Sequence, residues 1–315
     1  MVAAVQPGSG GAPVDEHVFL IGRPPLGEFL GYLQAQTIEG KTATPGELTA
    51  SWRSANDHIV DLERTEGGFA DAPQVSPLSP SLSALRDQVM QDPIAQRAYS
   101  MVPTEIAVVE LDRIVVFQKQ INLEYVKQLR EILPSSPTEE ELFHFCLPFD
   151  RRYDPPVQSA RTAQNGWTFV SQSQDFRLLD FVVLDPADIT SLQVTGAPAS
   201  VVGVIVGYGA NYLSAVQAEG RLVLNNGSHR AYAAREAGAT HVPCLVQQVS
   251  RREELAVIMG GEVANQPDLF LKDPRPPVLK DYFDPRLRMV LHVPRTHKQI
   301  RVAVSYGEEN APSLS

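Results

Sequence analysis

Cysteine, long apolar runs and a basic charge balance are all missing or scarce in this sequence. Its two cysteines, Cys146 and Cys244, lie far apart in apolar surroundings. Such a context is typical of buried free thiols and not of a disulfide or a metal site. No run of about 18 apolar residues is present, and no basic segment followed by an apolar one opens the chain. We therefore expect a cytoplasmic protein without a membrane segment.

The familiar short motifs of catalysis are absent too. The sequence contains no G-x-x-x-x-G-K-[ST], no G-x-S-x-G, no H-E-x-x-H and no paired C-x-x-C. These patterns mark phosphate-binding loops, nucleophile turns and zinc sites. Enzymes that depend on them are therefore not predicted.

An excess of acidic residues limits the partners that we expect. The chain has 37 acidic and 27 basic residues, a net charge of −10, whereas binding to duplex nucleic acid needs many phosphate contacts from Lys and Arg. One segment near the end, Arg286 to Arg301, contains five basic residues and no acid. A solvated face and a local nucleic-acid contact are both open for this segment.

The richest stretch is 221–246, which reads RLVLNNGSHRAYAAREAGATHVPCLV. It predicts a short strand, a turn at Gly227, a helix that ends at Gly238, and a second strand near Val242. Glycine permits a sharp turn or a close approach of the backbone. The first N–H groups of the helix lack intrahelical acceptors and lie at the positive end of its dipole, which favours an anion such as phosphate.

The side chains of this turn suit a phosphate as well. Arg230 offers a planar fork of donors, and His229 a polar contact that is neutral or charged near physiological pH. We expect the binding site to comprise Asn226, Gly227, Ser228, His229 and Arg230.

The segment N-G-S-H-R at 226–230 and the helix after it resemble the ParB/sulfiredoxin-like superfamily, whose members carry a strand, a G-x-H-R turn, a helix and a short strand. The stretch 106–133 is similar to the opening strand, turn and helix of that family. The resemblance implies an α/β fold with a mixed sheet. It also implies a nucleoside di- or triphosphate as ligand, with Mg2+ beside the phosphates and Lys119 near the terminal phosphate.

Departures from the family pattern narrow the function. Ser228 stands where sulfiredoxin has its catalytic cysteine, which argues against sulfinic-acid repair. The serine-kinase relatives have an acid after the first strand, but 116–120 (VFQKQ) contains none. Asn226 likewise replaces the usual aspartate of the turn. We therefore predict a nucleotide-dependent switch or slow NTPase that controls a protein contact.

Two alternatives remain open. The same pocket could serve a small-molecule kinase or another phosphotransferase, or a nuclease-like hydrolase. Alternatively, the chain is a structural or assembly protein with a degenerate core, which binds a protein partner or forms a homo-oligomer through its N-terminal helices. Their apolar stripes lie in 26–33 and 48–62.

Changes in composition divide the chain into several parts. Residues 44–47 (TPGE) predict a capped helix start, and the all-apolar run Val201–Val206 predicts a central strand. Residues 286–304 alternate in places and suggest an added hairpin. The predicted parts are a disordered tail at 1–15, a helical extension at 16–103 with a Pro/Ser linker near 72–83, a core at 104–250 with an insertion at about 134–200, and a C-terminal helix with an extended basic segment at 251–315.

Overall fold

The computed structural model describes residues 13–149, 157–162, 165–173, 175–189 and 194–309. The chain has an α/β fold and divides into two compact units. The first comprises Met1–Asp150 and Ala210–Arg295, and the second Arg151–Gly209 and Thr296–Ser315. The insertion therefore begins later than the predicted position 134, because helix α7 (Glu139–Cys146) packs within the first unit.

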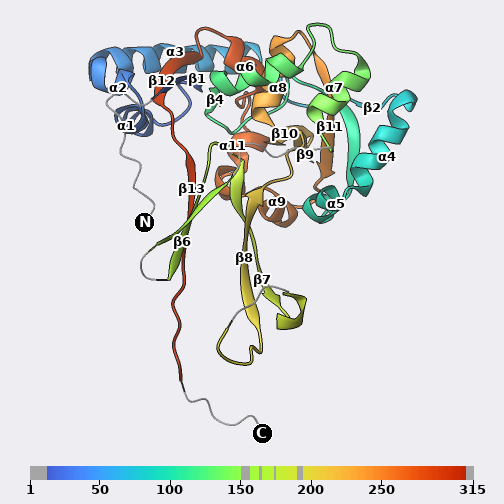
Figure 1. The fold of residues 1–315 in the computed structure, drawn as a ribbon. Coiled ribbons are helices and arrows are strands. Elements are labelled where there is room, and N and C mark those ends of the chain that lie inside the picture. The colour runs from blue at the N-terminus through green and yellow to red at the C-terminus, as the bar shows by residue number, and fades with distance from the viewer. Residues whose placement is uncertain (1–12, 150–156, 163–164, 174, 190–193, 310–315) are drawn as a thin grey trace. The chain divides into compact units, whose positions relative to one another are not determined.

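A five-stranded mixed sheet organises the first unit (Figure 1). Its central strand is antiparallel to one neighbour and parallel to the other, and its six middle residues are buried. In sheet order the strands are β10 (Arg221–Asn226), β9 (Ser214–Ala218), β11 (His241–Gln248), β3 (Thr104–Glu110) and β2 (Val75–Pro77).

Helices cover both faces of this sheet, since its strands are apolar on both sides. In β10, Leu222 and Leu224 join one hydrophobic cluster, whereas Val223 joins another. The first cluster contains residues of α4 (Ser83–Gln91), α5 (Pro93–Tyr99), α6 (Leu123–Ile132), α7 and α8 (Ser228–Glu236). The second contains residues of α9 (Arg252–Ile258), α10 (Gly261–Asn265) and α11 (Asp268–Leu271).

The predicted Pro/Ser linker is part of this sheet. Strand β2 pairs antiparallel with β3 at the sheet edge. Proline is tolerated in an edge strand because its missing N–H can face away from the neighbouring strand. A short helix, η1 (Pro80–Leu82), follows and buries Leu82. The linker prediction was wrong because strand pairing depends on a partner distant in the sequence.

A second sheet joins three distant parts of the chain. Strand β1 (Val14–Leu20) lies between β12 (Arg288–Pro294) and β4 (Gln120–Asn122) and is antiparallel to both. Regular structure thus begins at Val14, before residue 15. Asp15 is buried, with 6% of its surface exposed. The disordered tail was predicted too long at its end, while residues 1–12 lie outside the described residues.

The N-terminal helices pack against this second sheet. They are α1 (Leu26–Gln36), α2 (Glu39–Thr42) and α3 (Pro45–Thr65). Thr44 and Glu47 form the predicted capping box of α3. The apolar stripe at 26–33 is covered by β1 and β12, because Phe29 and Leu33 are fully buried in a cluster with Phe19 and Leu291. The stripe at 48–62 is buried as well, partly in the same cluster and partly against Leu287. Assembly through these stripes is therefore not supported.

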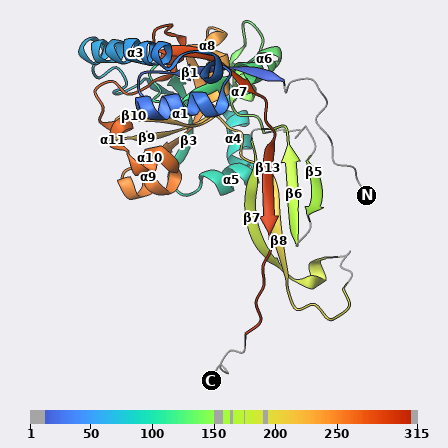
Figure 2. The ribbon, with the colours of Figure 1, turned by 90° about the vertical axis from the view of Figure 1, so that its left-hand side faces the viewer.

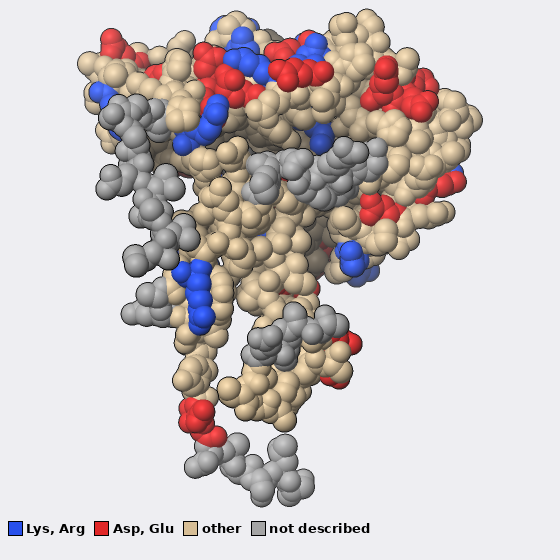
Figure 3. Space-filling model, in the orientation of Figure 1, with Lys and Arg blue, Asp and Glu red and all other residues tan. Residues whose placement is uncertain are grey.

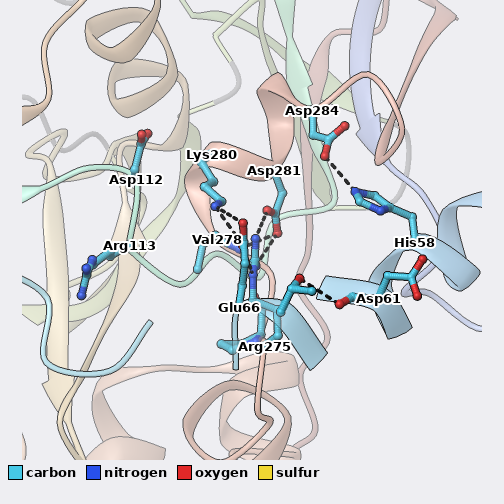
Figure 4. Close-up of polar contacts among 12 residues, drawn as sticks. His58, Asp61, Glu66, Asp112, Arg113, Arg275, Val278, Lys280, Asp281 and Asp284 are labelled. Carbon is cyan, nitrogen blue, oxygen red and sulfur yellow. Dashed lines mark hydrogen bonds and ion pairs between the residues drawn. The ribbon is translucent and has the colours of Figure 1, made fainter. Parts of the chain in front are cut away.

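One fully buried ion pair lies within the loop before β12. Arg275 is 0% exposed and donates two hydrogen bonds to Asp281, which is 2% exposed, with N–O distances of 2.6 and 3.1 Å (Figure 4). Its Nε donates to Glu66 at 3.0 Å, and Glu66 also accepts from Lys280. This cluster joins the end of α3 to the short helix η3 (Leu279–Phe283).

The second unit consists of two small antiparallel sheets. One has β6 (Gly166–Ser171) between β13 (Lys298–Ala303) and β5 (Gln158–Thr162), strands that lie side by side in Figure 2. The other is a hairpin of β7 (Phe176–Leu184) and β8 (Val201–Tyr208), with the short helix η2 (Pro186–Asp188) in its connection.

Two predictions for these strands were wrong. Strand β8 is not central, because it pairs only with β7 among the described residues. The C-terminal segment does not form a hairpin either, since β12 pairs with β1 and β13 with β6. Apolar faces fix the side-chain pattern of a strand but not its partner.

None of the described helices is both long and apolar enough to cross a membrane.

Candidate functional site

The turn at Gly227 connects β10 directly to α8, as the sequence predicts. Gly227 has φ 89° and ψ 27°, in the left-handed region. A Cβ atom at this position would lie 2.8 Å from Leu213 Cδ1 and 3.0 Å from Leu213 Cα. Asn226 fixes the turn from the strand side, because its Nδ2 donates to the carbonyl oxygens of Ala210 and Tyr212 at 2.9 and 3.1 Å. Glycine is thus required here for both conformation and space.

We expect Gly227→Ala to destabilise the fold more than the same change at Gly238. Both glycines have positive φ, but nothing lies within 4 Å of a Cβ at Gly238. Gly238→Ala should therefore cost about 1–2 kcal/mol for the conformation alone. Gly227→Ala adds the clash with Leu213, about 1–3 kcal/mol more. Chemical denaturation of both variants measures the difference, and equal losses would contradict the close approach at Gly227.

The first turn of α8 presents unused backbone donors. The helix has no side-chain cap, and the N–H groups of Ser228 and His229 donate to no acceptor among the described residues. Ser228 is 8% exposed. These groups lie at the positive end of the helix dipole, where an anion is stabilised.

His229 is a neutral acceptor in this structure. Its Nε2 accepts a hydrogen bond from the backbone N–H of Asn122 at 3.0 Å, and its ring lies 5.2 Å edge-on from that of Tyr125. Burial, with a smaller contribution from His17, lowers the pKa of His229 to about 4. Because Nε2 is the acceptor, the ring proton is on Nδ1. Of the two states that the sequence left open for His229, neutral or charged, the neutral one is therefore favoured near physiological pH.

Arg230 is held by the loop before β9. Its guanidinium donates to the backbone oxygen of Asn211 and to Asn211 Oδ1, the latter at 2.7 Å, and the residue is 8% exposed. Asn211 was not singled out from the sequence, since no local pattern links it to a residue 19 positions later. Arg230 therefore braces the turn.

Lys119 lies in an acidic environment. Its Nζ is 2.6 Å from Glu28 Oε1 and 3.5 Å from Glu262 Oε2. Partial burial lowers the pKa of Lys119, but the two carboxylates outweigh it and raise the pKa above its usual value. Lys119 is thus charged, and its ionic partners are protein carboxylates.

Asn122 joins the turn to the second sheet, which the sequence did not reveal. Its Oδ1 accepts from Tyr125 N at 3.0 Å and caps α6, and its Nδ2 donates to Asp15 Oδ2 at 3.2 Å. Arg295 also donates to Asp15, at 2.6 and 2.8 Å. Burial alone would raise the pKa of Asp15, but these bonds lower it. An Asn before the helix pattern at 123–132 was the available signal for the cap.

Four carboxylates of the stretches 106–133 and 221–246, at Glu110, Asp112, Glu124 and Glu236, are paired with basic residues. Asp112 accepts two hydrogen bonds from Arg235, at 3.0 and 3.3 Å. The other pairs are Glu110 with Arg113, Glu124 with Lys127 and Glu236 with Arg130. Within the described ranges, no group of three or more His, Cys, Asp or Glu side chains is arranged to hold a metal ion.

The basic C-terminal segment is divided between the two units. In the first unit, Arg286 pairs with Asp284, Arg288 donates to the carbonyl of Tyr282, and Arg295 binds Asp15. Lys298 and Arg301 belong to β13 of the second unit. The first-unit arginines thus bond to their own chain, which weakens the prediction of a nucleic-acid contact at Arg286–Arg301.

Both cysteines are free and buried, as predicted. Burial raises the pKa of Cys146 to about 12, so its thiol is protonated and unreactive at neutral pH.

Comparisons of the chain with protein-family models, curated proteins and solved structures give no match.

Proposed function

We propose that this chain binds a phosphate-bearing ligand, a nucleoside di- or triphosphate, at the N-terminus of α8. One observation carries the proposal: the unused N–H groups of Ser228 and His229 follow a left-handed glycine in a nine-residue helix. Three features favour a phosphate, namely the helix dipole, convergent N–H donors and a nearby hydroxyl. Mg2+ would accompany the phosphates from the solvent side.

Each side chain of the turn has a definite part in this proposal. The backbone N–H groups and the Ser228 hydroxyl contact the phosphate, whereas Asn226 and Arg230 fix the turn through the loop at 210–212. His229 stays neutral and links the turn to Asn122. Lys119 is not needed for the contact, because Glu28 already neutralises it.

We further propose that occupancy regulates a protein contact, with slow hydrolysis as a side activity. The route runs from His229 through Asn122 to Asp15, and thus from the turn to β1. A ligand that shifts the start of α8 would therefore also shift Asn122 and, through it, Asp15 in the second sheet. The kinase, phosphotransferase and hydrolase alternatives require a catalytic acid, whereas Glu110, Asp112, Glu124 and Glu236 each have a basic partner.

Isothermal titration with ATP, CTP, GTP, their diphosphates and inorganic phosphate tests the proposal. Ser228→Asp places a negative charge at the first residue of α8, which suits the helix but repels a phosphate. We expect this variant to lose about tenfold or more in affinity. Ser83→Asp, the same change at the first residue of α4, should leave binding unchanged.

Thermal melts of both variants show whether the fold persists. No binding to the wild-type chain, or equal binding by Ser228→Asp, would defeat the proposal. Binding of inorganic phosphate as tight as that of the nucleotides would restrict the ligand to phosphate alone.

A further inference from the structure

The β7–β8 hairpin exposes large apolar side chains to an unusual degree. Val183, Val202 and Phe181 are 76%, 70% and 61% exposed, and Leu178 is 41% exposed. The hairpin carries few charged atoms along its strands in Figure 3, where the tan surface dominates. A contiguous exposed apolar patch of this kind is typical of an interaction site.

These side chains belong to one face of the hairpin. Val202, Val204 and Val206 alternate along β8 and share a face. Their cross-strand partners on β7 are Val183, Phe181 and Leu178. The apolar face, defined by these six residues, contains no polar or charged side chain.

The outer edge of β8 is also open. Among the described residues, β8 pairs with β7 alone, so no second strand pairs with its other edge. Proteins protect such edges with charges, prolines or bulges. The sequence of β8, VVGVIVGY, has no charge and no proline, and the hairpin's one register shift is in β7, between Leu178 and Asp180.

We infer that two copies of this chain associate by antiparallel pairing of β8 with β8, centred on Val204. The two-stranded hairpin then becomes part of a four-stranded sheet, which is the more stable unit. A strand without charge repels its own copy least, whereas it offers nothing to attract an acidic or basic partner. The absence of charge on β8 therefore favours a second copy of the chain as the partner at this edge.

The positions of the two glycines select the register. Centred on Val204, the pairing places Gly203 opposite Ile205 of the second copy and Val202 opposite Val206, so that a large side chain covers each gap. Gly207 is likewise opposite Val201. Centring on Gly203 or on Ile205 would place glycine opposite glycine and leave the gap unfilled.

A cysteine at position 204 tests this register. Directly opposed residues have Cβ atoms about 4.5–5.5 Å apart, so a small movement of the strands brings them to the Cβ separation of a disulfide, about 3.5–4.5 Å. Cys146 and Cys244 are buried and do not compete. We expect Val204→Cys to form an intermolecular disulfide about tenfold faster than Val202→Cys. Position 202 is on the same face and 70% exposed, but it lies four residues, about 13 Å, from its own copy along the paired strands.

Sedimentation velocity completes the experiment with the full-length chain. The wild type should show a concentration-dependent dimer, and Val204→Lys should be monomeric, because lysine on an edge strand opposes pairing. A mixture of Val202→Cys and Val206→Cys chains should form the mixed disulfide. A monomeric wild type, or equal disulfide formation at 202 and 204, would overturn the inference.

Discussion

Replacing Arg275 by alanine lowers the free energy of unfolding by about 3–5 kcal/mol, the usual cost of removing one partner of a buried ion pair. The physical reason is the charge left behind. Asp281 is 2% exposed and has a carboxylate that accepts two of the Arg275 bonds. Among the described residues, the other donor to Asp281 is the backbone N–H of Val278, at 3.0 Å. Without the guanidinium, a buried carboxylate has too few donors. Urea denaturation of the purified chain measures the loss.

An exposed pair of the same chemistry provides the control. Arg64 and Asp61 form an ion pair whose side chains are 72% and 63% exposed. Arg64→Ala should therefore cost less than about 1 kcal/mol. A double change, Arg275→Met with Asp281→Leu, should recover much of the loss, because no buried charge is left unpaired. Equal losses at Arg275 and Arg64 would contradict the importance of burial.

The parts of the fold that the sequence predicted are those decided by neighbouring residues. Thr44 with Glu47 starts α3 through a capping box. The donors and acceptors of a capping box lie within four positions, so the pattern is complete in the sequence. The strand, turn and helix at 221–236 belong to the same class, because Gly227 ends one element and permits the next.

Partners at long range could not be predicted. Arg275 bonds to Glu66 across 209 positions, and Asp15 bonds to Arg295 across 280. Strand β8 shows the limit most clearly. Apolar residues on both faces are typical of a buried central strand. The same pattern also occurs in an exposed strand that forms an interaction site.

The candidate site shows both kinds of result. Its backbone geometry was predicted from Gly227, whereas the roles of its side chains were not. Arg230 was expected to meet a ligand, but Asn211 accepts its hydrogen bonds. His229 was expected to be either neutral or charged near physiological pH, and its surroundings favour the neutral form. A side chain's charge state depends on what covers it, which the sequence of the turn does not contain.

We expect the low pKa of His229 to make the fold sensitive to acid. The unfolded chain binds a proton at this residue below about pH 6.5, whereas the folded chain does so only below pH 4, since burial lowers the pKa of His229 to about 4. Between these values the unfolded state holds more protons. The free energy of unfolding therefore falls as the pH is lowered from about 6.5 to 4. The part due to His229 is about 2–3 kcal/mol, because each unit of pKa difference corresponds to about 1.4 kcal/mol. Protonation of Nε2 also removes the acceptor of the hydrogen bond from Asn122.

Glutamine in place of His229 separates this contribution from those of other groups. The new side chain in the variant His229→Gln does not titrate, and its amide oxygen can accept the Asn122 N–H. We expect the wild type to lose about 2–3 kcal/mol more than His229→Gln between about pH 7 and pH 4.5 in urea denaturation. His241→Gln, a change at a partly exposed imidazole on β11, should follow the wild type. A pH dependence of His229→Gln identical to that of the wild type would mean that His229 is solvated and charged at low pH, with its bond to Asn122 broken.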